Sequence, residues 1–303
     1  MCCVHVYLYV LRYNIVKRLG SGGFGAVYGV IGEDNNKYAL KELENFNSIN
    51  KDRFEREIRI LSQLDHPNIV KITQWNVGGD PPNFTPYYVM EYLSGGSLRE
   101  HMDEKFSRGE LFEPRWTINK IILPICNALA QAHSEKIYHR DLKPDNIMYT
   151  TPNRYEIKVT DWGLGKDVKR ESIALTAALG ELGGTPIYCA PEQWFGRDTV
   201  DGRADIFSIG VIFYEMLTSK KPITYEDNNN TLEKMVVQPP STYRSNITSR
   251  LDQSIKKMME IKPENRHNSI WDLITEIETL PENYSWGPKP TTPSRLLLKP
   301  YTP

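Results

Sequence analysis

One short stretch of the chain concentrates side chains that could do chemistry. Residues 138–147 read Tyr-His-Arg-Asp-Leu-Lys-Pro-Asp-Asn-Ile. They place a carboxylate (Asp141), a cation (Lys143) and an amide (Asn146) in one loop between a predicted helix and a predicted strand. A carboxylate can accept a proton from a hydroxyl, and an ammonium can neutralise negative charge that develops during a reaction. Because one loop holds all three groups, it is the strongest candidate for a catalytic role.

A glycine-rich stretch is the second candidate. Residues 20–25 read Gly-Ser-Gly-Gly-Phe-Gly and fit GxGxxG, which is a weak pattern because glycines also cluster in ordinary hairpin turns. A dinucleotide-binding turn would open a helix and meet an acidic residue about 20 positions later; Glu42 meets only the second requirement. Residues 26–30 are β-branched and alternating, so the glycines are expected to join two strands. They predict a flexible lid whose amides can approach phosphates closely.

Lys41 and Glu57 form the third candidate. Lys41 ends a strand that reads as buried, where a lysine must either pair or reach solvent at an edge. Glu57 lies on the following predicted helix among other charged residues and would ordinarily be one more solvated charge. Its role therefore depends on Lys41 needing a partner.

These motifs follow one another in an order that resembles the protein kinases. The loop at 138–147 is similar to the kinase catalytic loop HRDLKPxN, and the lysine two positions after the aspartate is the serine/threonine-kinase form. The resemblance covers about residues 13 to 280. Its motifs are the glycine-rich stretch, Ala39-Leu40-Lys41, the helix with Glu57, His139-Arg140-Asp141, Asp161-Trp162-Gly163, Ala190-Pro191-Glu192, Asp205 with Gly210, and Arg266.

The resemblance implies a serine/threonine protein kinase, which transfers the γ-phosphoryl group of ATP to a protein hydroxyl with the help of Mg²⁺. It implies that Asp141 is the catalytic base and that Lys143 neutralises charge on the γ-phosphate. It also implies that Lys41 grips the α- and β-phosphates and that Glu57 holds Lys41 in place.

Metal and nucleotide contacts are implied in the same way. Asn146 and Asp161 would supply the hard oxygen ligands that Mg²⁺ favours, and neither suits zinc. The residues expected around ATP by family architecture are the lid glycines Gly20, Gly22 and Gly25, the adenine neighbours Val27, Ala39 and Met148, and the backbone from Glu91 to Leu93 behind Met90.

One residue departs from the family pattern. Trp162 replaces the usual phenylalanine after the metal-binding aspartate. In the family this aromatic packs in a stack that would here include Leu61, Ile72 and His139, anchored on Asp205. A larger ring needs extra volume, and overpacking costs about 1–3 kcal/mol. We expect retained activity with an altered on/off balance.

Two other functions stay open at this point. Trp162 is the one feature that favours a kinase-like nucleotide-binding signalling module with weak or no phosphotransfer. A kinase fold that acts on a small molecule is disfavoured by residues 190–192 (Ala-Pro-Glu) and by Lys143, which in this family serve peptide substrates.

The segment between Asp161 and Glu192 carries candidate regulatory residues. Arg140 beside the base suggests that this segment responds to phosphorylation, since an arginine fork pairs well with a phosphorylated hydroxyl. Ser172 and Thr176 are the candidate sites, although an unmodified polar side chain is an equally good interpretation of either. Thr185 matches a family threonine that contacts the base and the lysine.

A buried ion pair is expected to brace the end of that segment. Glu192 and Arg266 would form it, and breaking such a pair costs about 3–5 kcal/mol. His267 follows Arg266 where the family often has proline, which is a small departure.

Sheet and helix patterns divide the chain into two parts. Alternating and β-branched runs predict strands at 15–16, 26–31, 37–41, 69–73 and 87–91. Apolar residues at three- and four-residue spacing predict helices at 51–64, 97–106, 116–134, 203–218, 232–237, 247–260 and 269–280, the third of them kinked at Pro124. The sequence predicts an α+β fold of two lobes, a small antiparallel β-sheet lobe with one helix and a larger, mainly α-helical lobe.

The same patterns predict the domain organisation. Residues 1–12 form an N-terminal extension, interpreted as an extra strand, a poorly ordered arm or a misassigned start. Residues 13–280 form the kinase domain, with the first lobe at 13–93, the second at 97–280 and a hinge near 93–96. Residues 281–303 are Pro-rich and aperiodic from Glu282 on, which predicts a tail or a surface strap.

Composition excludes several classes of protein. With 303 residues, 40% hydrophobic content and a formal net charge of -1, the chain is neither disordered nor collagen-like, and its balanced charge gives no field for nucleic acid. Its four cysteines form no CxxC pair, so neither a disulfide framework nor a zinc site is expected. We expect a location in the reducing cytoplasm. No apolar run approaches the roughly 20 residues of a membrane span.

Overall fold

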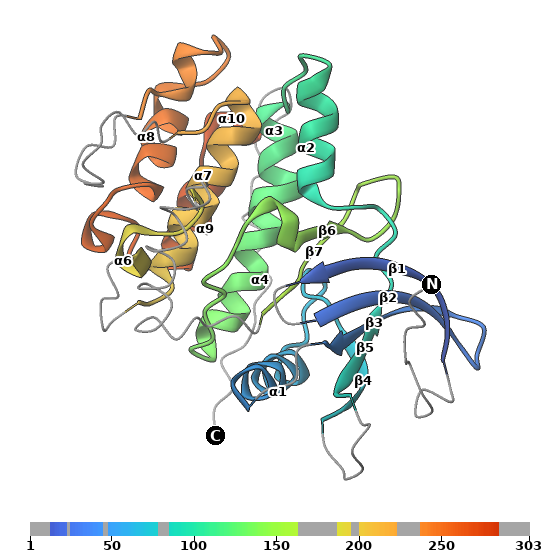
Figure 1. The fold of residues 1–303 in the computed structure, drawn as a ribbon. Coiled ribbons are helices and arrows are strands. Elements are labelled where there is room, and N and C mark those ends of the chain that lie inside the picture. The colour runs from blue at the N-terminus through green and yellow to red at the C-terminus, as the bar shows by residue number, and fades with distance from the viewer. Residues whose placement is uncertain are drawn as a thin grey trace, which may run out of the picture.

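An antiparallel sheet and one helix make up the first lobe, at the lower right of Figure 1. The sheet is five-stranded in the order β1-β2-β3-β5-β4. Its strands are β1 (Tyr13–Gly22), β2 (Gly25–Gly32), β3 (Lys37–Leu43), β4 (Ile72–Asn76) and β5 (Tyr87–Glu91). Helix α1 (Ser48–Gln63) buries one face, formed by Phe54, Glu57, Ile58 and Leu61. Residues three and four apart share a helix face, so the amphipathic pattern correctly predicted α1.

The computed structural model describes residues 13–22, 25–44, 48–77, 85–162, 187–194, 200–222 and 237–284. Several predictions lie outside these residues: the extension at 1–12, the lid tip at 23–24, most of the helix expected at 232–237, the tail from 285 on, and Gly163, Ser172, Thr176 and Thr185.

Helices dominate the second lobe, at the upper left of Figure 1. They are α2 (Leu98–Ser107), α3 (Pro114–Thr117), α4 (Leu123–Ser134), α6 (Pro191–Trp194), α7 (Arg203–Thr218), α8 (Ser249–Met258), α9 (Ile270–Glu278) and α10 (Pro281–Tyr284). Short 3-10 turns are η2 (Pro144–Asn146), η4 (Pro240–Thr242) and η5 (Pro263–Asn265). Helix α7 is buried from Ala204 to Thr218, and helices α3, α8 and α9 pack against it. Within the described part of the chain, no helix combines the length and apolar character needed to cross a membrane.

The long helix expected at 116–134 contains a π turn. It begins as α3, widens into the π segment η1 (Ile118–Ile122), where the Leu123 N–H donates to the Ile118 carbonyl, and continues as α4. Pro124 has no N–H, and its ring would clash with the carbonyl four residues earlier in a regular α-helix. A π turn next to this proline relieves that conflict, and the expected kink at Pro124 stays a prediction.

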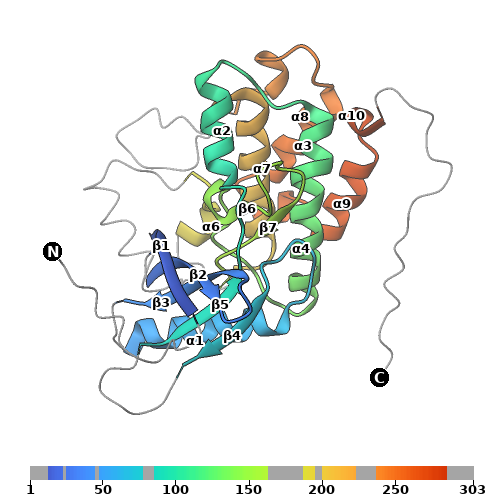
Figure 2. The same ribbon diagram turned by 90° about the vertical axis from the view of Figure 1, so that its right-hand side faces the viewer.

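A two-stranded sheet joins the two lobes. Strands β6 (Ile147–Tyr149) and β7 (Ile157–Val159) pair antiparallel and lie between the large sheet and the helices in both ribbon views (Figure 1 and Figure 2). The predicted hinge is bonded to β6, since the Gly95 N–H donates to the Tyr149 carbonyl at 3.1 Å and the Tyr149 N–H to the Gly96 carbonyl at 2.9 Å. On the other side the Val70 N–H donates to the Val159 carbonyl at 3.1 Å. Both lobes are therefore tied to the strand pair that carries the candidate site residues.

The end of the described chain corrects one expectation. We predicted an aperiodic segment from Glu282 on, but helix α10 includes residues 282–284. The Glu282 carboxylate is buried and accepts the Thr248 N–H at 2.8 Å, so it holds the start of α8. Periodicity could not reveal a helix this short.

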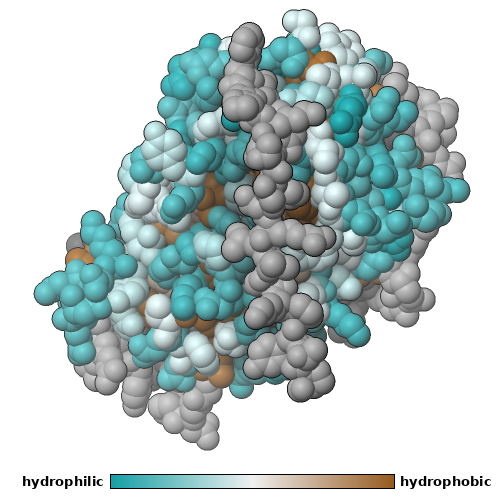
Figure 3. Space-filling model, turned by 180° about the vertical axis from the view of Figure 1, so that it is seen from behind, coloured by the Kyte–Doolittle hydropathy of each residue, from teal (hydrophilic) through white to brown (hydrophobic). Residues whose placement is uncertain are grey.

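Seen from behind, most of the coloured surface is hydrophilic, and hydrophobic residues show only in small separate areas (Figure 3).

Candidate active site

Three charged side chains from three elements meet between the lobes. Lys41 of β3 lies 2.8 Å from Oε1 and 3.0 Å from Oε2 of Glu57 on α1, and 2.8 Å from Oδ1 of Asp161, two residues beyond β7. The side chains of Lys41 and Glu57 are 7% and 4% exposed, whereas that of Asp161 is 39% exposed. We call these residues the ion-pair triad. The expected contact of Lys41 with Glu57 is therefore present, and Lys41 does not reach solvent at an edge.

Electrostatics stabilise the charged forms in the triad. Burial alone would lower the pKa of Lys41, but the carboxylates of Asp161 and Glu57 outweigh it and raise the pKa well above its ordinary value. The Lys41 ammonium in turn lowers the pKa of Asp161 below its ordinary value, against the effect of burial. Lys41 and Asp161 therefore stay in contact as a cation and a carboxylate at neutral pH.

The large aromatic residue after Asp161 is fully buried. The side chain of Trp162 is enclosed, its Nε1 donates to the Val159 carbonyl at 3.1 Å, and its ring lies 5.0 Å from that of His139 at 60°. Leu61 and Ile72 belong to the same hydrophobic core. The expected contact of this aromatic with His139 is thus present, while its contacts with Leu61 and Ile72 stay a prediction. The indole N–H, which a phenylalanine lacks, has a hydrogen-bond partner.

The candidate catalytic loop (residues 138–147) orients its own groups. Lys143 Nζ donates to Oδ2 of Asp141 at 3.0 Å, and Asn146 Nδ2 donates to the Asp141 carbonyl at 2.8 Å and to its Oδ2 at 3.3 Å. The Thr160 N–H donates to the Asn146 carbonyl at 2.9 Å, which fixes the loop beside the residue that precedes Asp161. The three groups singled out in the sequence therefore converge next to the triad.

A buried carboxylate on α7 anchors this loop. Asp205, which is fully buried, accepts the backbone N–H of His139 at 3.0 Å and that of Arg140 at 2.7 Å. Its Oδ2 also contacts Nε2 of His133 at 2.8 Å. Burial alone would raise the pKa of Asp205, but the His133 contact and these donors lower it. Arg140 itself has a backbone φ of 62°, so this anchorage holds a left-handed conformation that non-glycine residues rarely adopt.

The residues expected around the nucleotide lie on adjoining strands. Ala39 of β3 faces Met90 of β5 in the sheet register, and Val27 of β2 faces Lys41. Met148 on β6 forms a bridge with Ser97, at the start of the second lobe. These positions stay predictions for adenine contacts.

The glycines of the lid differ in what the structure requires of them. A Cβ on Gly25 would overlap the carbonyl oxygen of Glu42, so β2 and β3 can approach only with glycine there. A Cβ on Gly20 would meet nothing within 4 Å. As predicted, β1 and β2 pair across this turn as strands, which excludes the strand-to-helix turn of a dinucleotide site.

Three side-chain roles escaped the sequence analysis. Tyr88 donates its hydroxyl to Oε1 of Glu57 at 2.9 Å. Lys158 of β7 contacts Oε1 of Glu91 at 2.9 Å, so a side chain at the hinge is tied to the second lobe. The His133 contact with Asp205 is the third. A buried tyrosine or histidine resembles an ordinary core residue in the sequence, and a lysine on a strand resembles an ordinary surface charge. No local signal therefore distinguishes these three.

The predicted brace is confirmed. Arg266 and Glu192 form a bidentate pair, at 2.7 Å from Nη1 to Oε1 and 2.8 Å from Nη2 to Oε2, with side chains 0% and 3% exposed. Arg266 Nε also donates to the Glu260 carbonyl at 2.7 Å. The pair fixes helix α6 to the loop before α9.

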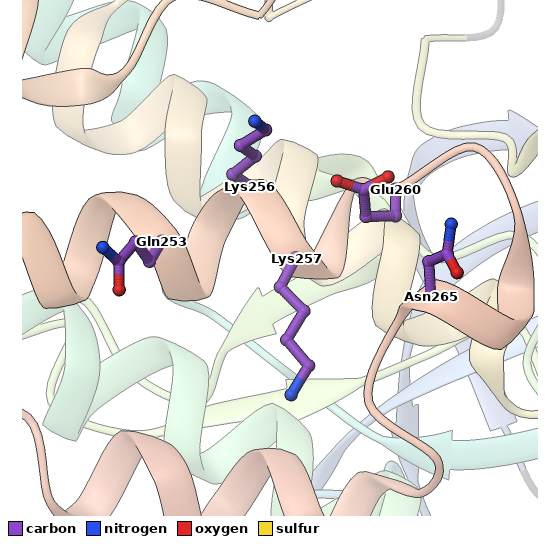
Figure 4. Close-up of a pocket in the computed structure, with 5 residues that line it drawn as sticks. All are labelled: Gln253, Lys256, Lys257, Glu260 and Asn265. Carbon is purple, nitrogen blue, oxygen red and sulfur yellow. The ribbon is translucent and has the colours of Figure 1, made fainter.

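A separate cavity lies on α8, away from the triad. It measures about 290 Å³. Its lining consists of Gln253, Lys256, Lys257, Glu260 and Asn265, with the two lysine side chains pointing in opposite directions (Figure 4). None of the predicted site residues belongs to it.

Comparison with known proteins places this arrangement in a family. The family model described as "Protein kinase domain" matches residues 13–277. The serine/threonine-protein kinase Pkn1 of Myxococcus xanthus is 34% identical over 271 residues, and the match covers 85% of this chain and 36% of that protein. The serine/threonine-protein kinase PknB of Mycobacterium tuberculosis is 31% identical over 277 residues, 88% of this chain and 42% of that protein. The chain thus spans about two fifths of the length of these relatives.

Solved structures show the same fold. The crystal structure of the Mycobacterium tuberculosis PknI kinase domain matches with a TM-score of 0.67 and 23% sequence identity, over 91% of this chain and 99% of that one. A double mutant of the same domain, C20A_R136A, matches with a TM-score of 0.68 at the same identity, over 92% of this chain and 98% of that one. The predicted bilobal α+β fold is therefore confirmed.

Proposed function

Because this chain belongs to the protein kinase domain family, we propose that it is a serine/threonine kinase that transfers the γ-phosphoryl group of ATP to a protein hydroxyl. One observation carries the proposal: the ion-pair triad and the candidate catalytic loop lie side by side between the lobes, joined through the Thr160 hydrogen bond to Asn146. A phosphoryl transfer needs cations on the phosphates and a carboxylate at the incoming hydroxyl, and this arrangement supplies both.

Each group in the site has a distinct task in this proposal. The Oδ2 atom of Asp141 accepts hydrogen bonds from Lys143 and Asn146, which fixes the carboxylate that receives the proton of the incoming hydroxyl. Lys143 neutralises charge on the γ-phosphate as the bond to the leaving group breaks. Lys41, held by Glu57, binds the α- and β-phosphates.

The donor set suits Mg²⁺. Asn146 uses its amide nitrogen toward Asp141, so its amide oxygen remains the acceptor end, and Asp161 offers a carboxylate that stays charged beside Lys41. Mg²⁺ commonly binds through one or two such oxygen ligands together with substrate phosphates. When bound, the ion would neutralise phosphate charge during transfer. Within the described ranges no group of three or more His, Cys, Asp or Glu could hold a metal by itself.

The proposal extends to the adenine site and the location. Val27, Ala39 and Met148 would contact adenine, with the backbone of residues 91–93 at its edge. We also propose a cytoplasmic location, on the ground that the four cysteines of the sequence form no CxxC pair and no regular spacing.

Labelled ATP with Mg²⁺ and a generic protein substrate tests this function. Wild-type protein should transfer label, and Asp141→Asn should lower kcat about 10²- to 10⁴-fold, because the variant cannot accept a proton. Asp65→Asn makes the same chemical change at a site whose side chain is 86% exposed, and should keep wild-type activity.

Two outcomes would reject the enzyme. Equal label with wild-type protein and Asp141→Asn would show that the loop does not act. Thermal stabilisation by ATP without any label would favour a nucleotide-binding signalling module instead.

A further inference from the structure

Tyr88 of β5 is a buried tyrosine with a polar contact that packing does not require. Tyr88 is 1% exposed, and its hydroxyl donates to Oε1 of Glu57 at 2.9 Å. A buried hydroxyl must find a partner, and this one finds the carboxylate that holds Lys41. Tyr88 therefore touches the triad from the sheet side.

The ring of Tyr88 contacts both neighbours of that carboxylate. Lys41 Nζ lies 5.7 Å from the ring centroid, which is within cation–π range. The ring of Phe54 on α1 lies 5.4 Å away at 38°. Phe54 and Glu57 are three residues apart and share a helix face, so Tyr88 holds one turn of α1 by its ring and by its hydroxyl.

The Lys41 ammonium has no N–H donor to spare for a phosphate. An ammonium has three N–H donors, and Lys41 makes three contacts, two with Glu57 and one with Asp161. Phosphates that bind Lys41 must take over at least one of these donors. Glu57 is 3% exposed, so a donor lost from its carboxylate cannot be replaced by bulk water.

We propose that Tyr88 is a positioning residue that gives Glu57 a hydrogen-bond donor independent of Lys41, and so frees an N–H of Lys41 for the phosphates of ATP. This role rests on the proposed kinase function. Burial and the charge of Glu57 raise the pKa of Tyr88 well above its ordinary value, so the phenol stays protonated and remains a donor.

Removal of one hydroxyl tests this role. Tyr88→Phe keeps the ring and its contacts with Phe54, and should raise KM for ATP about tenfold while kcat stays within about twofold, because a ground-state binding interaction is weakened. Tyr87→Phe is the matched control. Adjacent strand residues point to opposite faces, and Tyr87 packs in the smaller core of the sheet. It should keep the wild-type KM for ATP.

A second background shows whether the hydroxyl acts through Glu57. In Glu57→Leu protein the acceptor is gone. Adding Tyr88→Phe should therefore change the dissociation constant for ATP by less than about twofold. A further loss as large as in the wild-type background would mean that Tyr88 acts through packing, and would overturn the proposal. Equal KM values for Tyr88→Phe and wild-type protein would overturn it too.

Amide hydrogen exchange separates this proposal from the kinase function. The α1 amides should exchange about tenfold faster in Tyr88→Phe than in wild-type protein or Tyr87→Phe, since α1 loses a bond to the sheet. This measurement needs no turnover. Wild-type protein that transfers no phosphoryl group would reject the kinase function, while unchanged α1 exchange in Tyr88→Phe would reject the role of Tyr88.

Discussion

The ion-pair triad and the candidate catalytic loop are held in place by different kinds of contact. The triad joins β3, α1 and the end of β7 through contacts between side chains, Lys41 with Glu57 and with Asp161. The loop is held by its own backbone, since Asp205 accepts the N–H groups of His139 and Arg140. A side chain can be exchanged for one of similar volume, whereas a backbone N–H needs an acceptor whatever residue carries it.

That difference has a consequence for function. Contacts in the triad can be broken and remade while each lobe stays folded, so the triad can respond to phosphates that enter between the lobes. The loop is bonded to the buried helix α7 through Asp205, so we expect it to move with the second lobe.

Loss of the loop anchor should be the most damaging change. Asp205→Ala leaves two backbone N–H groups and His133 without their acceptor in a fully buried site, and should lower the free energy of unfolding by about 3–5 kcal/mol. Urea denaturation measures this. Asp201→Ala removes a carboxylate that is 44% exposed and paired with Arg203, and should cost less than about 1 kcal/mol. Similar costs for both variants would contradict the anchoring role.

We expect that the charged pair of Lys41 and Glu57 can be replaced by uncharged side chains with little loss in the free energy of unfolding. Lys41→Met leaves the buried Glu57 carboxylate without its cation and should cost about 3 kcal/mol in denaturant unfolding. Adding Glu57→Gln removes the unpaired charge and should bring stability back to within about 1 kcal/mol of wild type, while ATP affinity stays lost. If the double variant remained as unstable as the single one, the triad would be as essential to folding as the loop anchor.

Trp162 connects the two regions, and its replacement tests the overpacking expected from the sequence. Trp162→Phe removes the Nε1 hydrogen bond to the Val159 carbonyl and leaves space in a fully buried site. It should therefore lower the free energy of unfolding by about 1–2 kcal/mol. Calorimetry measures this. An increase in stability would show instead that the larger ring is strained.

Acid should affect both regions, with a smaller effect on the triad. The folded-state pKa values of Asp205 and Asp161 lie below the ordinary value of 3.8, so the stability they contribute is complete above that value and is lost as the pH falls through the folded-state pKa. One such group changes stability by at most about 1.4 kcal/mol per pH unit. Asp205→Asn should therefore flatten the pH dependence below pH 3.8. Asp161→Asn should flatten it less, because its side chain is 39% exposed and solvent screens its charge.

Local patterns were enough to predict many of the longer elements and several of the site contacts, but strands β6 and β7 were not among the strands predicted by range, and the strand expected at 69–73 lies at 72–76. The helical spacing of Phe54, Ile58 and Leu61 predicted α1 and put Glu57 on a helix next to the strand of Lys41. Residues 138–147 lie close together in sequence, so their convergence follows from chain connectivity. Glu192 and Arg266 were paired in advance by resemblance to a family, and the structure confirms that contact.

Other features had no local signal. The π turn before Pro124, helix α10 and the contact of Lys158 with Glu91 depend on neighbours distant in sequence or on elements too short for periodicity. The sequence by itself determined which chemical groups the chain possesses and which of them stand on the same short element. Only the tertiary structure decided which buried polar atoms became partners, as Tyr88 did for Glu57 and His133 for Asp205, because a hydrogen bond depends on a separation of about 3 Å between atoms that folding alone brings together.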